Sequence, residues 1–375
     1  MPFELGIENP LIGQYLVSRC DYVNVGPSLE SLIAFAVPQP PLALSKDNSF
    51  MMPDNSIVPF ATLVWFGKSS KDPEFRASRP IVAIGNFDGA HRGHASVASA
   101  ARQVAAPHRG RTSPVIALTF DPHPRAYFRP HKPFFRLTEP HQRAAALESL
   151  GFDAMVTLTF DDKLAGMSAD GFVRTILCDI LRVSAVVVGS DFHFGKDRAG
   201  TPDFLAAAGR EHGFLVRFVP PFRDLDGSIV SSSEIRKALS EGDISRATRL
   251  LGRPYEVEGT VIHGAKRGRE LGYPTANIAL PRESLLKFGV YAVRMVVDGV
   301  TRPGVASFGR RPMFDNGAPL LEVFLFNFSG DLYGKHVRVS VAAFIREEEK
   351  FSSLDALITQ MDLDQSRARR LLDSR

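Results

Sequence analysis

The chain has 375 residues, 44% of them hydrophobic and 23% charged, which excludes a disordered chain and suffices for two domains of ordinary size. Its 45 lysines and arginines against 41 aspartates and glutamates give a net charge of +4, which suits a small anionic substrate and predicts no nucleic-acid surface. With only Cys20 and Cys178, and no apolar run of the roughly eighteen residues that a membrane span needs, we expect a cytoplasmic chain without disulfides, thiolate zinc or a membrane partner.

Residues 1–75 form an N-terminal extension to which the sequence assigns no role. Prolines in the stretches 37–41 and 51–55 break any helical or strand period. The first fifty residues are more acidic than basic, so we expect no secretory or mitochondrial leader. One hypothesis is that Met51 or Met52 is the true initiator.

The strongest motif of the first half is a short apolar run followed by glycines and histidines. The run Ile81–Ile84 leads into a turn that holds Gly85 and Gly89. His91 and His94 then begin an alanine-rich segment, which predicts a strand, a tight loop and a helix. Free N–H groups at a helix N-terminus attract anions, and two imidazoles add donors, so the pattern predicts a phosphate site. The alternatives are two surface histidines or half of a metal site.

Up to about residue 220, short apolar runs rich in β-branched residues alternate with helical stretches. The predicted strands are 115–119, 154–158, 183–188 and 215–219, and predicted helices are 140–150 and 172–181. This alternation is typical of a parallel sheet with crossover helices, whose ligands bind beyond the carboxyl ends of the strands. Thr138 is the predicted N-cap of the helix over 140–150.

Two loops directly follow predicted strands, at residues 119–124 and 189–195. Because carboxyl ends of parallel strands share one edge of the sheet, we expect both loops beside His91 and His94. The alternative is that they are connectors without a function.

In the second half the sequence changes from helical to alternating periodicity. Two short helices are predicted within 232–251, and a last helix over 353–372. Between them the predicted strands are 255–262, 290–297, 320–328 and 337–344. Strands separated by turns, without long helices between them, favour an antiparallel barrel or sandwich.

The stretch 264–277 has the composition of a phosphate-binding loop but lacks the Walker A spacing. Lys266 and Arg269 can neutralise phosphate charge, while the Thr275 hydroxyl and the Asn277 carbonyl are hard oxygen ligands that suit Mg²⁺. The alternative is a basic surface hairpin.

A single carboxylate, Glu322, stands in an apolar strand. If it faces a pocket, it can act as a general base. Alternation by itself favours the simpler interpretation of a side chain that faces outward.

These motifs, in this order, resemble one family closely, the bacterial bifunctional riboflavin kinase and FAD synthetase. The motifs are Gly-Asn-Phe-Asp-Gly-Ala-His-Arg-Gly-His (85 to 94), Thr-Phe-Asp-Pro-His-Pro (119 to 124), Gly-Ser-Asp-Phe-His-Phe-Gly (189 to 195), Ser-Ser-Ser-Glu-Ile-Arg (231 to 236), Gly-Arg-Glu-Leu-Gly-Tyr-Pro-Thr-Ala-Asn (268 to 277) and Leu-Glu-Val-Phe-Leu (321 to 325). The resemblance implies an α/β Rossmann-like FMN adenylyltransferase domain over 76–240. It implies an all-β riboflavin kinase barrel with a C-terminal helix over 241–375.

For the first domain, the resemblance implies transfer of AMP from ATP to FMN. His91 and His94 would stabilise the transition state, and Arg236 would hold the ATP phosphates. The implied nucleotide-binding residues are Gly85, Asn86, Phe87, Gly93 and Ser232. The implied substrate-binding residues are Asp121, Pro122, Asp191, Phe192 and Phe194.

For the second domain, the resemblance implies phosphorylation of riboflavin to FMN by ATP. Glu322 would take the proton of the ribityl 5′-hydroxyl, and Thr275 and Asn277 would hold Mg²⁺. The implied nucleotide-binding residues are Gly264, Lys266, Gly268 and Arg269. The chain departs from the family pattern at His193, Ser233 and Met313.

Two other functions fit parts of the sequence. Another nucleotidyltransferase with a His-x-Gly-His motif, or an aminoacyl-tRNA synthetase, is one, although a Lys-Met-Ser-Lys-Ser-like loop is absent from the sequence. A barrel that binds RNA or flavin without turnover is the other, and salt-sensitive RNA binding would favour it.

Overall fold

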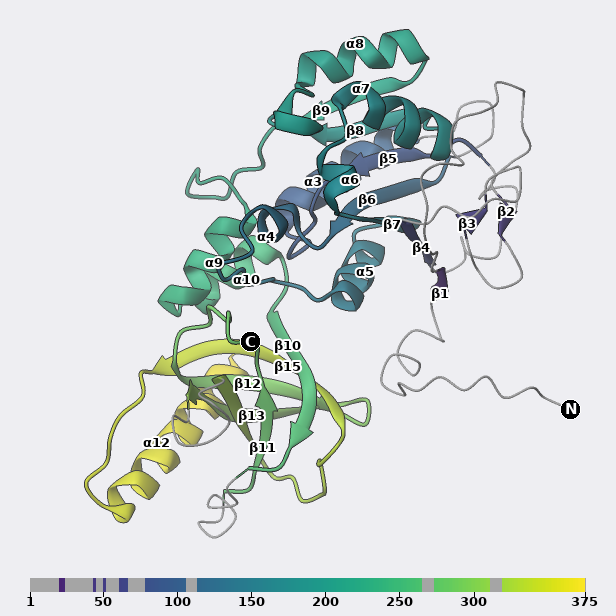
Figure 1. Ribbon diagram of the computed structural model, residues 1–375. Coiled ribbons are helices and arrows are strands. Elements are labelled where there is room, and N and C mark those ends of the chain that lie inside the picture. The colour runs from purple at the N-terminus through teal and green to yellow at the C-terminus, as the bar shows by residue number, and fades with distance from the viewer. Residues whose placement is uncertain are drawn as a thin grey trace, which may run out of the picture. The chain divides into compact units, whose positions relative to one another are not determined.

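The computed structural model describes residues 78–105, 113–264, 273–310 and 319–374, together with four strands before residue 67. The chain divides into two compact units. The first, here the α/β unit, comprises 1–134 and 138–228, and the second, the barrel unit, comprises 135–137 and 229–375. The predicted fold class is confirmed in both (Figure 1). Among the described residues, no helix combines the length and the apolar character that a membrane crossing requires.

A seven-stranded sheet in the order β1-β4-β7-β6-β5-β8-β9 forms the centre of the α/β unit. Its strands are β1 (Cys20–Val23), β4 (Ala61–Phe66), β5 (Ile81–Ile84), β6 (Val115–Asp121), β7 (Ala154–Thr159), β8 (Ala185–Gly189) and β9 (Leu215–Val219). The last five are parallel, and β4 and β1 add an antiparallel edge. A separate small hairpin joins β2 (Ala43–Leu44) and β3 (Phe50–Met51).

Helices cover both faces of this sheet, because the parallel strands are apolar on both sides. The helical elements are α3 (Arg92–Val104), α4 (Pro124–Phe128), α5 (Pro140–Ser149), α6 (Asp162–Ala165), α7 (Ala169–Gly171), the π-helix Phe172–Ile180, the short 3₁₀ turn Lys196–Arg198 and α8 (Pro202–His212). One buried cluster joins alternate strand residues to the π-helix and α8, and the other joins the remaining residues to α3 and α5. From β5 the chain adds β6 and then β7 on one side of the sheet. It then returns to the other side of β5 and adds β8 and β9 there. A ligand crevice is therefore expected at the carboxyl ends of β5 and β8, where the direction reverses.

The N-terminal extension contributes two strands to this sheet, β1 and β4, neither of which was predicted. Strand β4 pairs antiparallel with β7, and Trp65 and Phe66 are buried in it. The largely apolar run of β4 was the available signal, but no local pattern shows that a strand before the first βα unit pairs with β7. Residues 61–66 are thus part of the folded α/β unit.

The barrel unit is a closed antiparallel barrel in the order β10-β11-β14-β13-β12-β15. The strands are β10 (Tyr255–Ile262), β11 (Thr275–Ala279), β12 (Gly289–Val297), β13 (Val300–Arg310), β14 (Pro319–Leu325) and β15 (His336–Arg346). Two helices precede the barrel, α9 (Ser232–Glu241) and α10 (Ile244–Leu251), and the C-terminal helix α12 (Leu354–Asp373) packs on its outer surface. The predicted pair of helices and the closing helix are confirmed.

Three features of the sequence were interpreted wrongly or missed. Strand β11 was not predicted, because its first residues belong to the glycine-rich stretch 264–277. Strand β13 was not predicted, because Pro303 and Gly304 interrupt its alternation. Thr138 does not cap α5. The N-cap is Glu139, which forms a reciprocal capping box with Gln142, and Thr138 bonds elsewhere.

Candidate active sites

His91 and His94 form a closely packed pair at the start of α3. The centroids of the two rings lie 3.7 Å apart, with only 16° between the planes. Each ring caps the other residue's backbone: the His94 N–H donates to His91 Nδ1 over 3.3 Å, and the His91 N–H donates to His94 Nδ1 over 3.2 Å. His91 is therefore the N-cap of the helix and His94 lies in its first turn, where the sequence placed them.

This reciprocal capping decides which ring nitrogen can bind a ligand. Because both Nδ1 atoms accept N–H groups, each neutral ring carries its proton on Nε2. Two parallel rings thus present two Nε2–H donors, at the positive end of a helix dipole. The arrangement favours an anion. A metal ion bound through the two Nδ1 atoms would have to displace both capping hydrogen bonds.

Buried polar contacts fix the loop that leads to the histidines. The Gly89 N–H donates to Thr138 Oγ1 over 3.1 Å, and the Thr138 N–H donates to Asp88 Oδ1 over 3.3 Å. Asp88 and Thr138 are both buried. Phe87 is 1% exposed at a positive φ of 50°, and its ring lies 5.1 Å from that of His94. Neither Asp88 nor Thr138 was predicted as a site residue, because only the fold brings them together.

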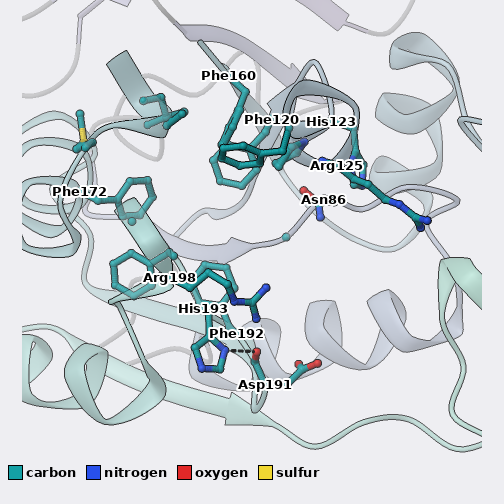
Figure 2. Close-up of a pocket in the computed structure, with 18 of the residues that line it drawn as sticks. Asn86, Phe120, His123, Arg125, Phe160, Phe172, Asp191, Phe192, His193 and Arg198 are labelled. Atoms are coloured by element: carbon teal, nitrogen blue, oxygen red, sulfur yellow. Dashed lines mark hydrogen bonds between the residues drawn. The ribbon is translucent and has the colours of Figure 1, made fainter. Parts of the chain in front are cut away.

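A cavity of about 710 Å³ opens at the carboxyl ends of β5, β6, β7 and β8 (Figure 2). Its lining residues are Gly85, Asn86, Phe120, His123, Pro124, Arg125, Phe128, Arg129, Phe160, Leu164, Ala165, Met167, Phe172, Asp191, Phe192, His193, Phe194, Gly195 and Arg198. Figure 2 shows Asn86, Phe120 and Arg125 on one side, and Phe192 and Arg198 on the other. Cavities of this size, largely apolar with a few polar groups, are typical of small-molecule sites.

The cavity combines aromatic walls with cationic groups. Phe120 and Phe160 pack edge to face at 5.9 Å, and Phe192 and Phe194 are stacked at 5.4 Å. Gly200 allows the Phe194 ring to lie where it does, since a Cβ there would lie 2.6 Å from the ring. Such walls suit a flat aromatic ligand, and arginines at the rim suit a phosphate.

The structure brings together part of the predicted set. Gly85, Asn86, Asp191, Phe192 and Phe194 line the cavity.

The other predicted residues of the α/β unit lie outside that lining. Asp121 ends β6 and Pro122 follows it, with His123 and Arg125 as the lining residues of that loop. Gly93 lies in the first turn of α3, and Phe87 is buried beneath the histidines. The lining residues Phe120, Phe160, Arg125 and Arg198 were missed, because a phenylalanine at a strand end has the same pattern as a core residue.

Ser232 and Arg236 belong to the barrel unit, in helix α9. Ser231 is the N-cap and accepts the Glu234 N–H, so Ser232 is the first helical residue. Arg236 Nε donates to the carbonyl oxygen of Phe135 over 2.7 Å.

A second polar group lies on the outer face of the barrel. Asn277 in β11 pairs with Glu322 in β14, and Glu322 pairs with Ser307 in β13, so the three side chains share one face. Thr275, two residues before Asn277, lies on the same face. Alternate residues such as Ala276 and Val323 are buried inside the barrel. Glu322 does face outward, but it is only half-exposed there.

The surroundings of Asn277 fit a hard cation. The residue is 3% exposed, and its Oδ1 has no hydrogen-bond partner among the described residues. Its Nδ2 donates to the Thr275 carbonyl over 3.3 Å, which leaves Oδ1 as the free end of the amide. A Cβ at Gly264 would lie 2.5 Å from Asn277 Nδ2, so only glycine lets the chain approach this closely. Lys266, Gly268 and Arg269 lie outside the described residues.

Comparison with known families also divides the chain into two parts, near the boundary between the two units. The FAD synthetase family matches residues 75–234, and the riboflavin kinase family matches residues 251–372. A bifunctional riboflavin kinase/FMN adenylyltransferase from Pseudomonas fluorescens is 43% identical over 300 residues, which cover 80% of this chain and 94% of the relative. The protein of the same name from Escherichia coli K12 is 37% identical over 290 residues, covering 77% and 91%.

A solved structure is also similar over most of the chain. The crystal structure of a protein named a macrolide-efflux protein, from Streptococcus pneumoniae, aligns with a TM-score of 0.71 and 32% identity. The alignment covers 80% of this chain and 96% of that protein.

Proposed function

The chain belongs to the family of bifunctional riboflavin kinases and FMN adenylyltransferases, and on that premise we propose which of its residues carry the two reactions. The chain is a riboflavin kinase and an FAD synthetase. It phosphorylates riboflavin to FMN and then joins FMN to AMP from ATP, with release of pyrophosphate. The observation that carries this function is the match of one family to each of the two folds.

Adenylyl transfer takes place at the histidine pair. The FMN phosphate attacks the α-phosphorus of ATP and pyrophosphate leaves, so negative charge builds up on the α-phosphate oxygens. The two Nε2–H donors of His91 and His94 stabilise that charge, supported by the dipole of α3. Because the Nδ1 capping bonds orient the rings before substrate binds, little reorganisation is needed during the reaction.

FMN occupies the cavity of the α/β unit. Its isoalloxazine ring packs among phenylalanines such as Phe120, Phe160 and Phe192, and an arginine at the rim, Arg125 or Arg198, holds its phosphate. Asn86, two residues after the end of β5, lines the cavity in the stretch that leads to the histidines. Asp191 and Phe194 complete the flavin side of the cavity, and Asp121 and Pro122 shape the loop that bears Arg125.

Riboflavin phosphorylation takes place on the outer face of the barrel. Glu322 accepts the proton of the ribityl 5′-hydroxyl while the hydroxyl oxygen attacks the γ-phosphorus of ATP, and ADP leaves as the bond to the β,γ-bridging oxygen breaks. Mg²⁺ would be held by Asn277 Oδ1 and the Thr275 hydroxyl, and when bound it neutralises phosphate charge. Because Gly264 has no side chain, it leaves room for the Asn277 amide. Lys266, Gly268 and Arg269 bind ATP. With two cysteines in the chain, we place both reactions in a reducing cytoplasm.

The test separates the two activities. Purified protein is incubated with riboflavin, ATP and Mg²⁺, and the flavins are resolved by chromatography. His94→Ala is expected to reduce FAD formation by roughly 10²–10³-fold while FMN accumulates. Glu322→Ala is expected to block FMN formation while added FMN is still converted to FAD. If the wild-type protein makes neither product, or if each variant loses both activities while it remains folded, the assignment is wrong.

A further inference from the structure

The segment that follows β15 carries a second carboxylate, Glu348, to the face that holds Glu322. A Cβ at Gly309 would lie 2.0 Å from Glu348 Oε1, so this carboxylate lies directly against strand β13. Ser307 pairs with Glu322, and Gly309 is two residues farther along the same face. Gly309 is therefore a diagonal cross-strand neighbour of Glu322, and such neighbours lie roughly 7–8 Å apart. Glycine at 309 is what leaves room for the carboxylate.

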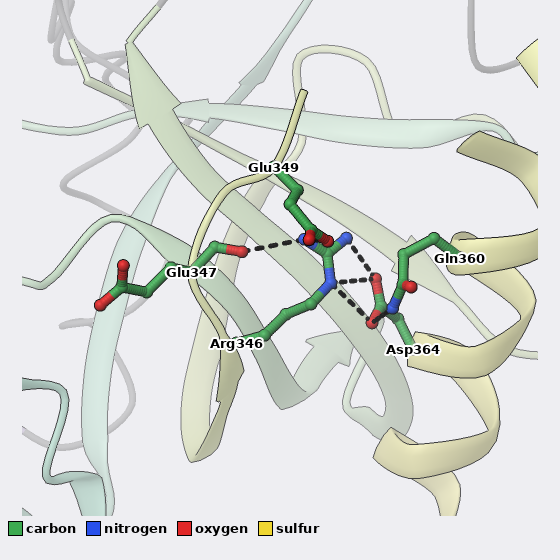
Figure 3. Close-up of polar contacts among 5 residues, drawn as sticks. All are labelled: Arg346, Glu347, Glu349, Gln360 and Asp364. Atoms are coloured by element: carbon green, nitrogen blue, oxygen red, sulfur yellow. Dashed lines mark hydrogen bonds and ion pairs between the residues drawn. The ribbon is translucent and has the colours of Figure 1, made fainter. Parts of the chain in front are cut away.

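Ion pairs of the two residues before Glu348 hold this segment in place, and Figure 3 shows those of Arg346. Arg346 Nη2 and Nε donate to Asp364 of α12, over 2.7 Å to Oδ2 and 2.9 Å to Oδ1, and Gln360 Nε2 donates to the same carboxylate over 3.0 Å. Lys287 Nζ pairs with Glu347 over 2.7 Å. Glu348 itself has no hydrogen bond or ion pair within the part of the chain that is described. Arg346 and Glu347 are thus held by ion pairs, whereas the Glu348 carboxylate can accept hydrogen bonds from a ligand.

The electrostatics of this face also indicate a ligand that donates hydrogen bonds. Glu348 is exposed as a residue, yet partial burial of its carboxyl group, and then the charge of Glu322, raise its pKa above the ordinary value. Two carboxylates of like charge repel each other unless donors lie between them. Asn277 Oδ1, buried and without a partner among the described residues, is a third acceptor on this face. The face thus concentrates acceptors.

We propose that Glu348 binds the ribityl chain of riboflavin by accepting a hydrogen bond from a hydroxyl group next to the one that Glu322 deprotonates. A polyol has a hydroxyl on each successive carbon, so a second acceptor beside the base holds the chain in the orientation that presents its terminal hydroxyl. The flavin ring has fewer donors for a carboxylate to bind. This inference rests on the proposed kinase function of the barrel unit, and it makes Glu348 a determinant of substrate specificity.

The experiment measures the KM for riboflavin in FMN formation by the full-length protein, for wild type and for Glu348→Ala. Loss of a hydrogen bond to a charged acceptor is expected to raise this KM about tenfold or more, with a smaller change in kcat. The KM for ATP and the dependence on Mg²⁺ are expected to stay at wild-type values. Lumiflavin, which has a methyl group in place of the ribityl chain, is expected to inhibit both proteins with the same inhibition constant.

Two further variants separate binding from structure. Gly309→Ala is expected to reproduce the increase in KM, because the new methyl group displaces the carboxylate. Glu349→Ala, which removes an exposed neighbouring carboxylate whose ion pair with Arg346 spans 3.8 Å, is expected to leave the KM for riboflavin unchanged.

Three results would overturn the inference. They are an unchanged riboflavin KM in Glu348→Ala, an equal loss of lumiflavin binding, and a parallel shift in Mg²⁺ dependence, which would make Glu348 a metal ligand. A wild-type protein that makes no FMN would instead refute the kinase function itself.

Discussion

Removing the Asp364 carboxylate is expected to destabilise the barrel unit and leave the α/β unit unaffected. The Asp364 side chain is 7% exposed and that of its partner Arg346 19%, so Asp364→Ala leaves a largely buried guanidinium without its main counter-charge. Breaking such a pair typically costs about 3–5 kcal/mol. Because Arg346 still donates to the Glu347 carbonyl over 2.9 Å, we expect the lower end, about 3 kcal/mol. For a unit of this size, such a loss of stability lowers the Tm by roughly 6–12 °C.

The single tryptophan of the chain allows the two units to be followed separately. Trp65 is buried in β4 of the α/β unit, so its fluorescence reports unfolding of that unit alone, whereas calorimetry detects both. Asp364→Ala should lower the midpoint temperature of one calorimetric transition, the one that tryptophan fluorescence does not detect. Glu349→Ala is the matched control, because its ion pair with Arg346 spans 3.8 Å and its side chain is 63% exposed, which predicts a change below about 0.5 kcal/mol. An unchanged barrel transition in Asp364→Ala, or an equal shift in the fluorescence transition, would refute the reasoning.

Three other predictions follow from single contacts. Thr138→Val leaves the buried Gly89 N–H without its acceptor and should slow FAD formation without affecting FMN formation, whereas Thr138→Ser should restore it; equal loss of both products would count against this. Gly264→Ala pushes the Asn277 amide aside, so the Mg²⁺ concentration needed for half-maximal kinase activity should increase while adenylylation of added FMN stays constant. Burial first, and a hydrogen bond to a carboxylate of α12, raise the pKa of Tyr273 to about 12, so the folded barrel binds this proton more tightly than the unfolded chain does. Stability should therefore fall as the pH rises from about 10 to 12, and less so in Tyr273→Phe, as followed by tyrosinate absorbance and thermal unfolding; an identical decline in both proteins would contradict the assignment.

Local patterns were sufficient where a segment's role depends on its own residues. The strand Ile81–Ile84, its glycine turn and the histidines at the helix start are all contiguous, and the structure has them as the sequence predicts. The expectation that ligands bind beyond the carboxyl ends of parallel strands then located the cavity, because it depends only on strand direction. Strand β4 and strand β13 could not be found in this way, since one joins the sheet from outside the βα units and the other is interrupted by Pro303 and Gly304.

The barrel face shows why alternation alone does not reveal the surroundings of Glu322. The pattern correctly predicts a side chain that faces out of the barrel, and the usual inference is that such a side chain meets water. In this fold the outer surface is partly covered by α12 and by the segment that carries Glu348, so outward means half-buried. Neither covering element is near Glu322 in the sequence. Its environment therefore depends on contacts that no local period encodes.

The two candidate sites have opposite hydrogen-bonding character, and each matches the charge that the reaction proposed for it develops. At the start of α3, mutual capping leaves Nε2–H donors at a helix N-terminus, which lower the energy of a phosphate that gains negative charge. On the barrel, Glu322, Glu348 and Asn277 Oδ1 are acceptors, which suit a substrate that brings hydroxyl protons and a metal ion. A donor-rich helix end would not deprotonate a hydroxyl. This difference gives a physical reason for placing the two reactions on two separate folds.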